Sequence, residues 1–289
     1  MDGTPELWTA VSNTLNSDVR KIRRIAGSGV GNAFIVQVQD GRTVFCKTHA
    51  RPTPGMFRSE SDGLDFLRVP DGPRVPQVLA VNDGVGEPCF ILLEAIQSTR
   101  PDRDGDRRAG EALAVLHCAP SEVQFGYPIT NHIGTLEQDN TWSSDWAEFF
   151  IERRLAPQIA HAHRCLGRSL RNTLGTVLER ARTELRIDEA PCRIHGDLWA
   201  GNRLTDENGD IWLIDPAVVH GHREVDLAMM KLFGGFGSAC FEAYTSVAPL
   251  EPGATQRIGF YQLYFLLVHV NLHGPSWAGQ VAQVAWDLS

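Results

Sequence analysis

One segment constrains this chain more than any other, because it places two carboxylates and an amide on short strands and loops. Asp197 follows His195-Gly196, Asn202 lies five positions later, and Asp215 lies thirteen positions after Asn202. Kinase-type enzymes use this order for a catalytic base and metal ligands. Asn208-Gly209 predicts a hairpin turn inside the segment. The segment therefore predicts a phosphotransfer centre.

The first third of the chain has the pattern of a small sheet. Apolar side chains have helical spacing over residues 5–15, and a second helix is expected from residue 56 to 67, before Pro70. Asp40-Gly41 predicts a two-residue turn between two strands. The sequence predicts five strands in all, at residues 19–26, 34–39, 43–47, 78–81 and 89–94.

The remaining two thirds are predominantly helical in pattern. The phosphotransfer segment supplies the only hairpin expected there. The chain is therefore predicted to be α+β, with a small lobe at residues 1–96 and a larger helical lobe at residues 97–289. The expected helices cover residues 107–117, 145–164, 167–185, 224–233, 255–272 and 277–288.

Charge and composition argue against several classes of protein. The formal net charge of −8 at pH 7 argues against nucleic acid as the main partner, since phosphate backbones bind clustered Lys and Arg. The longest apolar segment, residues 258–270, contains polar side chains and is too short to span a bilayer. The six cysteines form no Cys-x-x-Cys pair, and the N-terminus lacks a secretory pattern. A cytoplasmic location is expected, and the oligomeric state is left open.

Candidates for the nucleotide half of the site precede the segment along the chain. Gly27, Ser28 and Gly29 begin a glycine-rich turn whose amides could bind phosphate, although turns of this kind are common in hairpins without any ligand. Lys47 ends an apolar strand and needs an anionic partner, which Glu60 on the following helix can supply. An ordinary ion pair would explain these two residues if the downstream segment were absent.

The residues of the segment itself have distinct expected roles. Asp197 is the candidate base that accepts the proton of an acceptor hydroxyl group. Asn202 offers a neutral oxygen and Asp215 an anionic oxygen, which is a suitable ligand set for one or two Mg²⁺ ions completed by phosphate and water. His195 is expected to support the loop rather than to catalyse, because Asp197 already fills the acid-base role.

Several stretches of the chain resemble the fructosamine kinase (ketosamine-3-kinase) family, and the resemblance extends almost from end to end. His-Gly-Asp followed by Asn and Asp is shared by many small-molecule kinases. Leu-Trp-x-Gly-Asn together with Gly-His-Arg-Glu-x-Asp is characteristic of this family. The stretches that carry the resemblance are residues 195–202, 215–218, 221–229 and 233–236, with upstream matches at residues 110–117, 125–127, 131–134 and 138–142.

The resemblance implies a fold, a cofactor and site residues. The fold would be the bilobal protein-kinase-like fold shared with aminoglycoside phosphotransferases and choline kinases. Lys47 with Glu60 would orient ATP, Glu94, Ala95 and Ile96 would form the hinge against adenine, and Asn202 with Asp215 would bind Mg²⁺. Trp199 would pack on the sugar of the acceptor, since aromatic faces bind the C–H groups of sugar rings.

Other positions have a structural or uncertain role under the resemblance. Asp226 would brace the catalytic loop through hydrogen bonds to its backbone. Val219-His220 stands where relatives often carry tyrosines, which suggests an altered substrate pocket. His220 and His222 have the spacing of a metal pair, but loop support is the favoured interpretation because no third ligand lies at a suitable spacing.

The resemblance implies an ATP- and Mg²⁺-dependent kinase that phosphorylates the 3-hydroxyl group of a small-molecule or protein-linked ketosamine of the fructosamine or ribulosamine type. This reaction makes the adduct labile and supports deglycation. One alternative is another kinase of the same fold that acts on an aminoglycoside or choline, and acidic residues around the acceptor would favour that alternative. A nucleotide-binding pseudokinase is the other alternative, although a pseudokinase usually lacks at least one of the catalytic residues present here.

Overall fold

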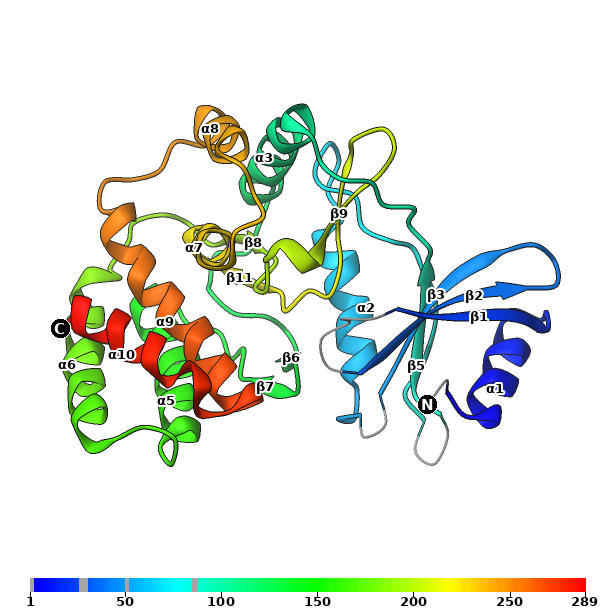
Figure 1. Ribbon diagram of the computed structural model, residues 1–289. Coiled ribbons are helices and arrows are strands. Elements are labelled where there is room, and N and C mark those ends of the chain that lie inside the picture. Colours follow the sequence, from blue (N-terminus) through cyan, green and yellow to red (C-terminus); the bar gives the residue numbers. More distant parts are fainter. Residues whose placement is uncertain (1–2, 26–30, 50–51, 85–87) are drawn as a thin grey trace.

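A five-stranded antiparallel sheet forms one side of the molecule (Figure 1). The computed structural model describes residues 3–25, 31–49, 52–84 and 88–289. The strand order is β1-β2-β3-β5-β4, and every pair of neighbours is antiparallel. This sheet confirms the predicted strands, with bounds β1 (Val19–Ile25), β2 (Asn32–Val38), β3 (Thr43–Thr48), β4 (Val78–Asn82) and β5 (Phe90–Glu94).

The turn between β2 and β3 differs from the prediction of two residues. The Val38 amide donates to the Arg42 carbonyl at 3.0 Å, so three residues, 39–41, form the loop. Gly41 has φ of +92°, whereas Asp40 does not have a positive φ. A two-residue turn of the type favoured by Asp-Gly needs positive φ at both positions, so the chain adopts the three-residue turn that ends in a left-handed glycine.

Two helices flank this sheet. α1 (Pro5–Leu15) begins at Thr4, whose hydroxyl accepts from the Leu7 amide at 3.3 Å, and it buries Leu7, Val11 and Leu15 against apolar side chains of the sheet. α2 (Met56–Leu67) lies between the sheet and the helical part of the molecule (Figure 1). Glu60 is buried on α2, which places its carboxylate near the strand that carries Lys47.

The second part of the chain is mainly helical, as predicted, and surrounds the largest apolar core. Its central helix, α9, is buried on nearly every face. None of the helices among the described residues has the length and hydropathy that are needed to cross a bilayer. The helices are α3 (Arg103–Cys118), α4 (Trp146–Phe150), α5 (Ala156–Ala162), α6 (Arg168–Glu184), α7 (Glu224–Phe233), α8 (Ser238–Val247), α9 (Ala254–His273) and α10 (Ala278–Asp287).

The helix predicted over residues 145–164 is interrupted. A π-helical turn, Ile151–Leu155, separates α4 from α5, and the Ala156 amide donates to the carbonyl of Ile151 five residues earlier. Pro157 is the physical cause, because proline has no N–H group and its ring clashes with the carbonyl four residues before it. The wider turn accommodates that carbonyl, which belongs to Arg153 and instead accepts from the Arg154 side chain at 3.1 Å.

The prediction of a single hairpin in the helical part was wrong. In addition to the predicted pair β9 (Arg203–Thr205) and β10 (Ile211–Leu213), β6 (Asn131–Ile133) pairs with β7 (Leu136–Gln138), and β8 (Cys192–Ile194) pairs with β11 (Val219–Gly221). Three-residue strands are too short to show a two-residue period, and β8 and β11 are far apart in sequence. The sequence also gave no expectation of α8.

Candidate active site

A cavity of about 800 Å³ lies between the sheet and the helical part of the molecule. Most of the residues expected at the site line it. Ala95 does not, and Gly27, Ser28 and Gly29 lie outside the described residues. The expected residues that line the cavity are Lys47, Glu60, Glu94, Ile96, Asp197, Trp199, Asn202 and Asp215.

The loop that carries Asp197 is packed tightly against the segment after Asp215. Gly196 has φ of +79°, and a Cβ atom there would lie 2.1 Å from the Ala217 carbonyl oxygen, so only glycine fits this close approach. The Ala217 amide donates to the His195 carbonyl at 2.9 Å. Asp215 itself has φ of +55°, which is uncommon for residues other than glycine. These contacts hold the two carboxylates close together.

Asp197 has the environment of a proton acceptor. The Asn202 side-chain amide donates to its Oδ2 at 3.0 Å and to its carbonyl oxygen at 2.8 Å. Burial and the negative charge of Asp215 raise the pKa of Asp197 well above its usual range. A carboxylate with a raised pKa is a stronger base once it is ionised, which suits a group that removes a hydroxyl proton.

Lys47 lies between two carboxylates. Its Nζ donates to Glu60 Oε2 at 2.9 Å and also forms an ion pair with Asp215 Oδ1. Burial raises the pKa of Glu60 to about 8, although the Lys47 ammonium acts in the opposite direction. The two carboxylates outweigh the effect of burial on Lys47 and raise its pKa, so the ammonium stays charged. The predicted Lys47–Glu60 pair is therefore present.

The donor groups near Asp215 fit a hard divalent cation. Asp215 lies close enough to Asp197 for its negative charge to raise the pKa of that carboxyl, so a cation would offset negative charge between them. The Asn202 amide nitrogen binds Asp197, and no described residue bonds to Asn202 Oδ1. Among the described residues, no group of three His, Cys, Asp or Glu side chains could hold a metal alone. Mg²⁺ bound through two protein oxygens, phosphate and water needs no such group.

The sheet side of the cavity is apolar, apart from its charged residues. The Glu94 side chain accepts from the Gln77 amide at 3.1 Å, which fixes the chain where it leaves the sheet toward Ile96. A flat apolar slot of this kind is typical of a site for a purine ring. The apolar side chains of the slot are Ile35, Phe45, Leu93, Ile96, Leu204 and Ile214.

Trp199 lies on the other side of Asp197 and is 37% exposed. A Cβ atom on Gly201 would lie 2.3 Å from the Trp199 ring, so the ring lies directly over the Gly201 backbone. The absence of a side chain at Gly201 lets the indole lie flat beside the catalytic loop. The Trp199 ring is therefore partly exposed to the cavity, and its contact with an acceptor stays a prediction.

The comparisons with known proteins agree with this geometry. The sequence model of the fructosamine kinase family matches residues 5–288. The chain belongs to the fructosamine kinase family. Members of this family are kinases, so the chain is a transferase with an alcohol group as acceptor.

Individual relatives cover almost the whole chain. A probable ketoamine kinase of Synechocystis sp. is 32% identical, with 97% of this chain and 96% of the relative covered. The chloroplastic protein-ribulosamine 3-kinase of Arabidopsis thaliana is 32% identical, with 94% of this chain and 83% of the relative covered.

Solved structures give the same assignment and fold. A Thermobifida fusca protein whose crystal structure is assigned to fructosamine-3-kinase superposes with a TM-score of 0.88, at 34% identity and with 99% of both chains covered. An aminoglycoside phosphotransferase, solved as a ternary complex with ADP and hygromycin B, has a TM-score of 0.66 at 16% identity, with 98% of this chain and 99% of that chain covered. At that identity the likeness concerns the fold alone, and it confirms the predicted kinase-like fold.

In this fructosamine kinase family member, Asp226 braces the catalytic loop. Its carboxylate accepts from the His195 amide at 2.7 Å and the Gly196 amide at 2.8 Å, and it lies 3.2 Å from His117 Nε2. The His195 ring accepts from the Asp197 amide at 3.2 Å and lies 3.0 Å from the Ile214 carbonyl oxygen. The geometry agrees with the structural roles predicted for Asp226 and His195.

The prediction that Val219-His220 alters the substrate pocket was wrong. Val219 is buried in the core, and neither residue lines the cavity. β11 pairs with β8, the strand that leads into the loop that carries Asp197. His220 Nδ1 lies 2.6 Å from the Ser121 hydroxyl, and its ring packs on Phe66 with centroids 4.8 Å apart. His220 therefore supports the loop region, as the sequence favoured.

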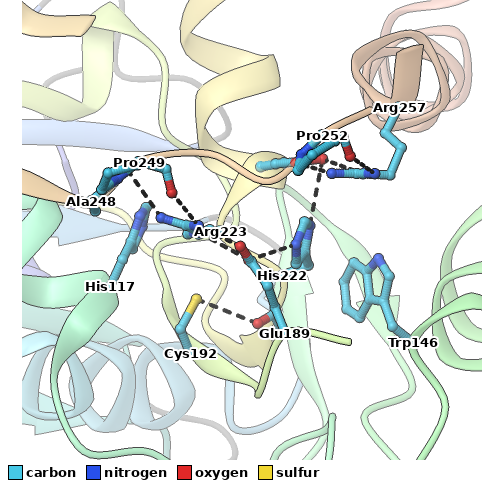
Figure 2. Close-up of polar contacts among 12 residues, drawn as sticks. His117, Trp146, Glu189, Cys192, His222, Arg223, Ala248, Pro249, Pro252 and Arg257 are labelled. Carbon is cyan, nitrogen blue, oxygen red and sulfur yellow. Dashed lines mark hydrogen bonds and ion pairs between the residues drawn. The ribbon is translucent and has the colours of Figure 1, made fainter. Parts of the chain in front are cut away.

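A network of buried and partly buried charged residues supports the start of α7, which carries Asp226 (Figure 2). Glu189 lies between Arg223 and His222, with Oε2 2.9 Å from both Arg223 Nε and His222 Nε2. Arg223 also donates to the Ala248 carbonyl at 3.1 Å, and Arg257 holds Glu224 through two hydrogen bonds of 2.5 and 2.8 Å. The network ties the start of α7, which carries Asp226, to its surroundings. His222 is thus part of this network and not of a metal pair.

The Glu189 carboxylate makes stability depend on pH. Hydrogen bonds from His222 and Arg223 outweigh burial and lower the pKa of Glu189 from 4.5 to about 2. A carboxyl group with a lowered pKa stabilises the fold above its usual pKa, and this contribution is lost as pH falls toward 2. After allowance for solvent screening, Glu189→Gln is expected to lower the free energy of unfolding by about 1–2 kcal/mol at pH 7 and by less at pH 3, measured by urea denaturation.

Glu184→Gln is the control for this experiment. Glu184 forms an exposed i,i+4 pair with Arg180 at 3.5 Å, and such pairs contribute little. The free energy of unfolding of Glu184→Gln should match that of the wild type at both pH values. A Glu189→Gln effect equally large at pH 3 and pH 7 would contradict the assignment of the pH dependence to this carboxyl group.

The sequence did not predict the other wall of the cavity. Phe233, His269 and Trp277 line it from the end of α7 and the end of α9. Phe233 belongs to one of the stretches that resemble the family, residues 233–236, so the sequence held a signal that this residue could be functional. α9 is apolar on nearly all faces, and periodicity could not show which of its residues face the cleft.

Proposed function

We propose that this protein transfers the γ-phosphoryl group of ATP to the 3-hydroxyl group of a fructosamine- or ribulosamine-type ketosamine. The observation that supports the proposal most directly is the position of Asp197 between two halves of one cavity that differ in their side chains. One half holds Lys47, Glu60 and Asp215, and the other holds Trp199 and further aromatic rings. Family membership and the relatives named as ketoamine and ribulosamine kinases support this choice of acceptor.

The nucleotide would occupy the half nearest the sheet. We assign residues 1–96 to nucleotide binding and residues 97–289 to the catalytic loop and the acceptor site. Adenine would lie in the apolar slot beside Glu94, Ala95 and Ile96, and Lys47, held by Glu60, would contact the phosphates. The structural neighbour solved with ADP has the same fold, which supports a nucleotide in this cavity.

The transfer follows from these positions. Asp197 accepts the proton of the acceptor hydroxyl as its oxygen bonds to the γ-phosphorus, and the bond to the β-bridging oxygen breaks and releases ADP. Asn202 and Asp215 would hold Mg²⁺, which neutralises negative charge on the phosphates. The raised pKa of Asp197 strengthens it as a base, and the Asn202 hydrogen bond orients its carboxylate. The protein therefore contributes mainly position and charge.

The charges of the cavity argue against the aminoglycoside alternative. Its carboxylates, among the described residues, are Glu60, Glu94, Asp197 and Asp215, and all four belong to the nucleotide or catalytic set. A site for a polycationic acceptor would need additional acidic residues around Asp197. A pseudokinase is disfavoured because Lys47, Glu60, Asp197, Asn202 and Asp215 are all present and close together. A cytoplasmic location remains a prediction from the sequence.

An assay of ATP consumption tests the acceptor. With fructosyl-lysine, ribulosyl-lysine, kanamycin and choline offered separately, we expect turnover with one or both ketosamines, because relatives are named as ketoamine and ribulosamine kinases and the cavity lacks the additional acidic residues that polycationic kanamycin would need. Phosphorus NMR of the product should place the phosphate on the 3-hydroxyl group. Turnover with kanamycin or choline alone would reject the proposed acceptor while retaining a kinase.

A further inference from the structure

Three aromatic rings form one wall of the cavity on the acceptor side. The Phe233 and His269 ring centroids are 4.7 Å apart, those of His269 and Trp277 are 4.5 Å apart, and those of Phe233 and Trp277 are 6.2 Å apart. All three residues line the cavity. We call this group the aromatic wall. Its members come from the end of α7, the last turns of α9 and the 3₁₀ turn Pro275–Trp277.

The aromatic wall is adjacent to the catalytic loop. A Cβ atom on Gly235 would lie 2.2 Å from the Cβ of Ala200, so the turn after Phe233 touches the residue that follows Trp199. Gly235 has φ of +86°, which glycine adopts without strain. An acceptor sugar beside Trp199 and Asp197 would therefore lie next to the aromatic wall.

Among the described residues, this part of the cavity has no lysine or arginine side chain for an anion, and its titratable residues are His269 and the neighbouring His273. Lys47 is the only Lys or Arg among the described lining residues, and it is held by Glu60 and Asp215. Burial lowers the pKa of His269, so its ring is neutral near pH 7. His269 Nδ1 lies 2.8 Å from the Phe265 carbonyl oxygen, which holds the ring in place. A carboxylate placed here would lose water without gaining a lysine or arginine partner among the described residues.

We propose that the aromatic wall of Phe233, His269 and Trp277 binds the amine substituent of the ketosamine and selects uncharged alkyl or ring substituents over substituents that carry a carboxylate. The inference rests on the proposed function and adds a specificity to it. Adducts on the ε-amine of lysine fit this wall, because four methylene groups follow the nitrogen. Adducts on the α-amine of a free amino acid do not fit, because a carboxylate lies two bonds from the nitrogen.

Known ring interactions support both parts of this selection. A protonated secondary amine is attracted to the face of an aromatic ring, and methylene groups pack against the same face. A carboxylate is repelled by the negative face of the ring. The wall would therefore act on substrate binding and not on the transfer step.

Three ketosamines test the inference on the wild-type enzyme. Fructose bearing a carboxymethylamino group at carbon 1 and the glycinamide adduct have nearly the same shape and differ in charge, and fructose bearing a propylamino group is an uncharged alkyl adduct of similar length. We expect kcat/KM to be at least about tenfold higher for the propylamino and glycinamide adducts than for the carboxymethyl adduct, through KM. Equal kcat/KM values for the three adducts would overturn the inference and leave the proposed function intact.

Variants of the aromatic wall test whether it causes the preference for uncharged amine substituents. Trp277→Ala should raise KM for the propylamino adduct about tenfold, reduce the preference over the carboxymethyl adduct, and leave kcat and the KM for ATP nearly unchanged. Phe233→Leu is a second, milder variant with the same expected direction. Trp286→Ala, on an exposed tryptophan outside the cavity, is the matched control and should behave as wild type.

The outcomes separate the two proposals. If Trp277→Ala and Phe233→Leu remain folded by circular dichroism and keep the wild-type preference, the wall is not the selecting surface. If the wild-type enzyme phosphorylates no ketosamine but does phosphorylate another alcohol, the proposed function fails and the inference fails with it.

Discussion

Asp197→Asn is expected to lower kcat by about 10²–10⁴-fold, because the amide cannot accept the proton of the acceptor hydroxyl group. ATP affinity should change little, since Lys47 and the apolar slot do not involve Asp197 directly. Steady-state kinetics with a ketosamine and titration calorimetry with ATP measure the two quantities. A variant with unchanged kcat would remove Asp197 from the role of base.

Measuring the stability of Asp197→Asn distinguishes a loss of catalysis from a loss of folding. Burial and the charge of Asp215 raise the pKa of Asp197, so its ionised form is unfavourable in the folded protein at pH 7. A neutral amide avoids this cost and can still accept from the Asn202 side chain. The melting temperature should therefore equal or exceed that of the wild type. Asp287→Asn, at an exposed position on α10, is the control for both activity and stability.

Asp226→Ala is expected to have the largest effect on stability, a loss of about 3–5 kcal/mol in the free energy of unfolding. The substitution would leave the buried amides of His195 and Gly196 without their acceptor, and His117 without its anionic partner. Although burial acts to raise it, the pKa of Asp226 is lowered, chiefly by the hydrogen bond with His117. Urea denaturation at pH 7 measures the loss.

Asp226→Asn is the matched variant for this prediction. An amide keeps the volume and one acceptor oxygen but loses the charge, so the loss of stability should be smaller than for alanine. At temperatures below their melting points, both variants should also have a lower kcat, because the loop that carries Asp197 loses or weakens the hydrogen bonds from the His195 and Gly196 amides to residue 226. A loss below about 1 kcal/mol for Asp226→Ala would mean that the loop is held by other contacts.

Most of the sheet and several helices could be predicted from local patterns. Strands and turns in β1 to β5 are set by neighbouring residues, so alternation and turn residues located them. The details that failed are local ones that hydrophobic periodicity does not record. Asp40-Gly41 joins its strands by a three-residue turn, and Pro157 converts part of a predicted helix into a π turn. The spacing of apolar residues does not show how many residues a turn contains or how a helix accommodates a proline.

The residues of the candidate site also divide into those that could be predicted from the sequence and those that could not. Asp197, Asn202 and Asp215 were found because they lie within nineteen positions of one another, on either side of one short hairpin. Lys47 and Glu60 were found because the order of groups along the chain is characteristic of kinases. The Glu189 network and the aromatic wall were not found, since their members meet only when β8, α7 and α9 pack together.

The sequence by itself identified the candidates for the base, the metal ligands and the nucleotide lysine, because these groups must occur with defined types and order. The tertiary structure decided which apolar residues face the acceptor. α9 is buried on nearly all faces, so nothing in its own pattern distinguishes His269 from its core neighbours. Only the packing of its last turn against Phe233 and Trp277 exposes that residue to the cleft, and this packing defines the surface proposed to select the substrate.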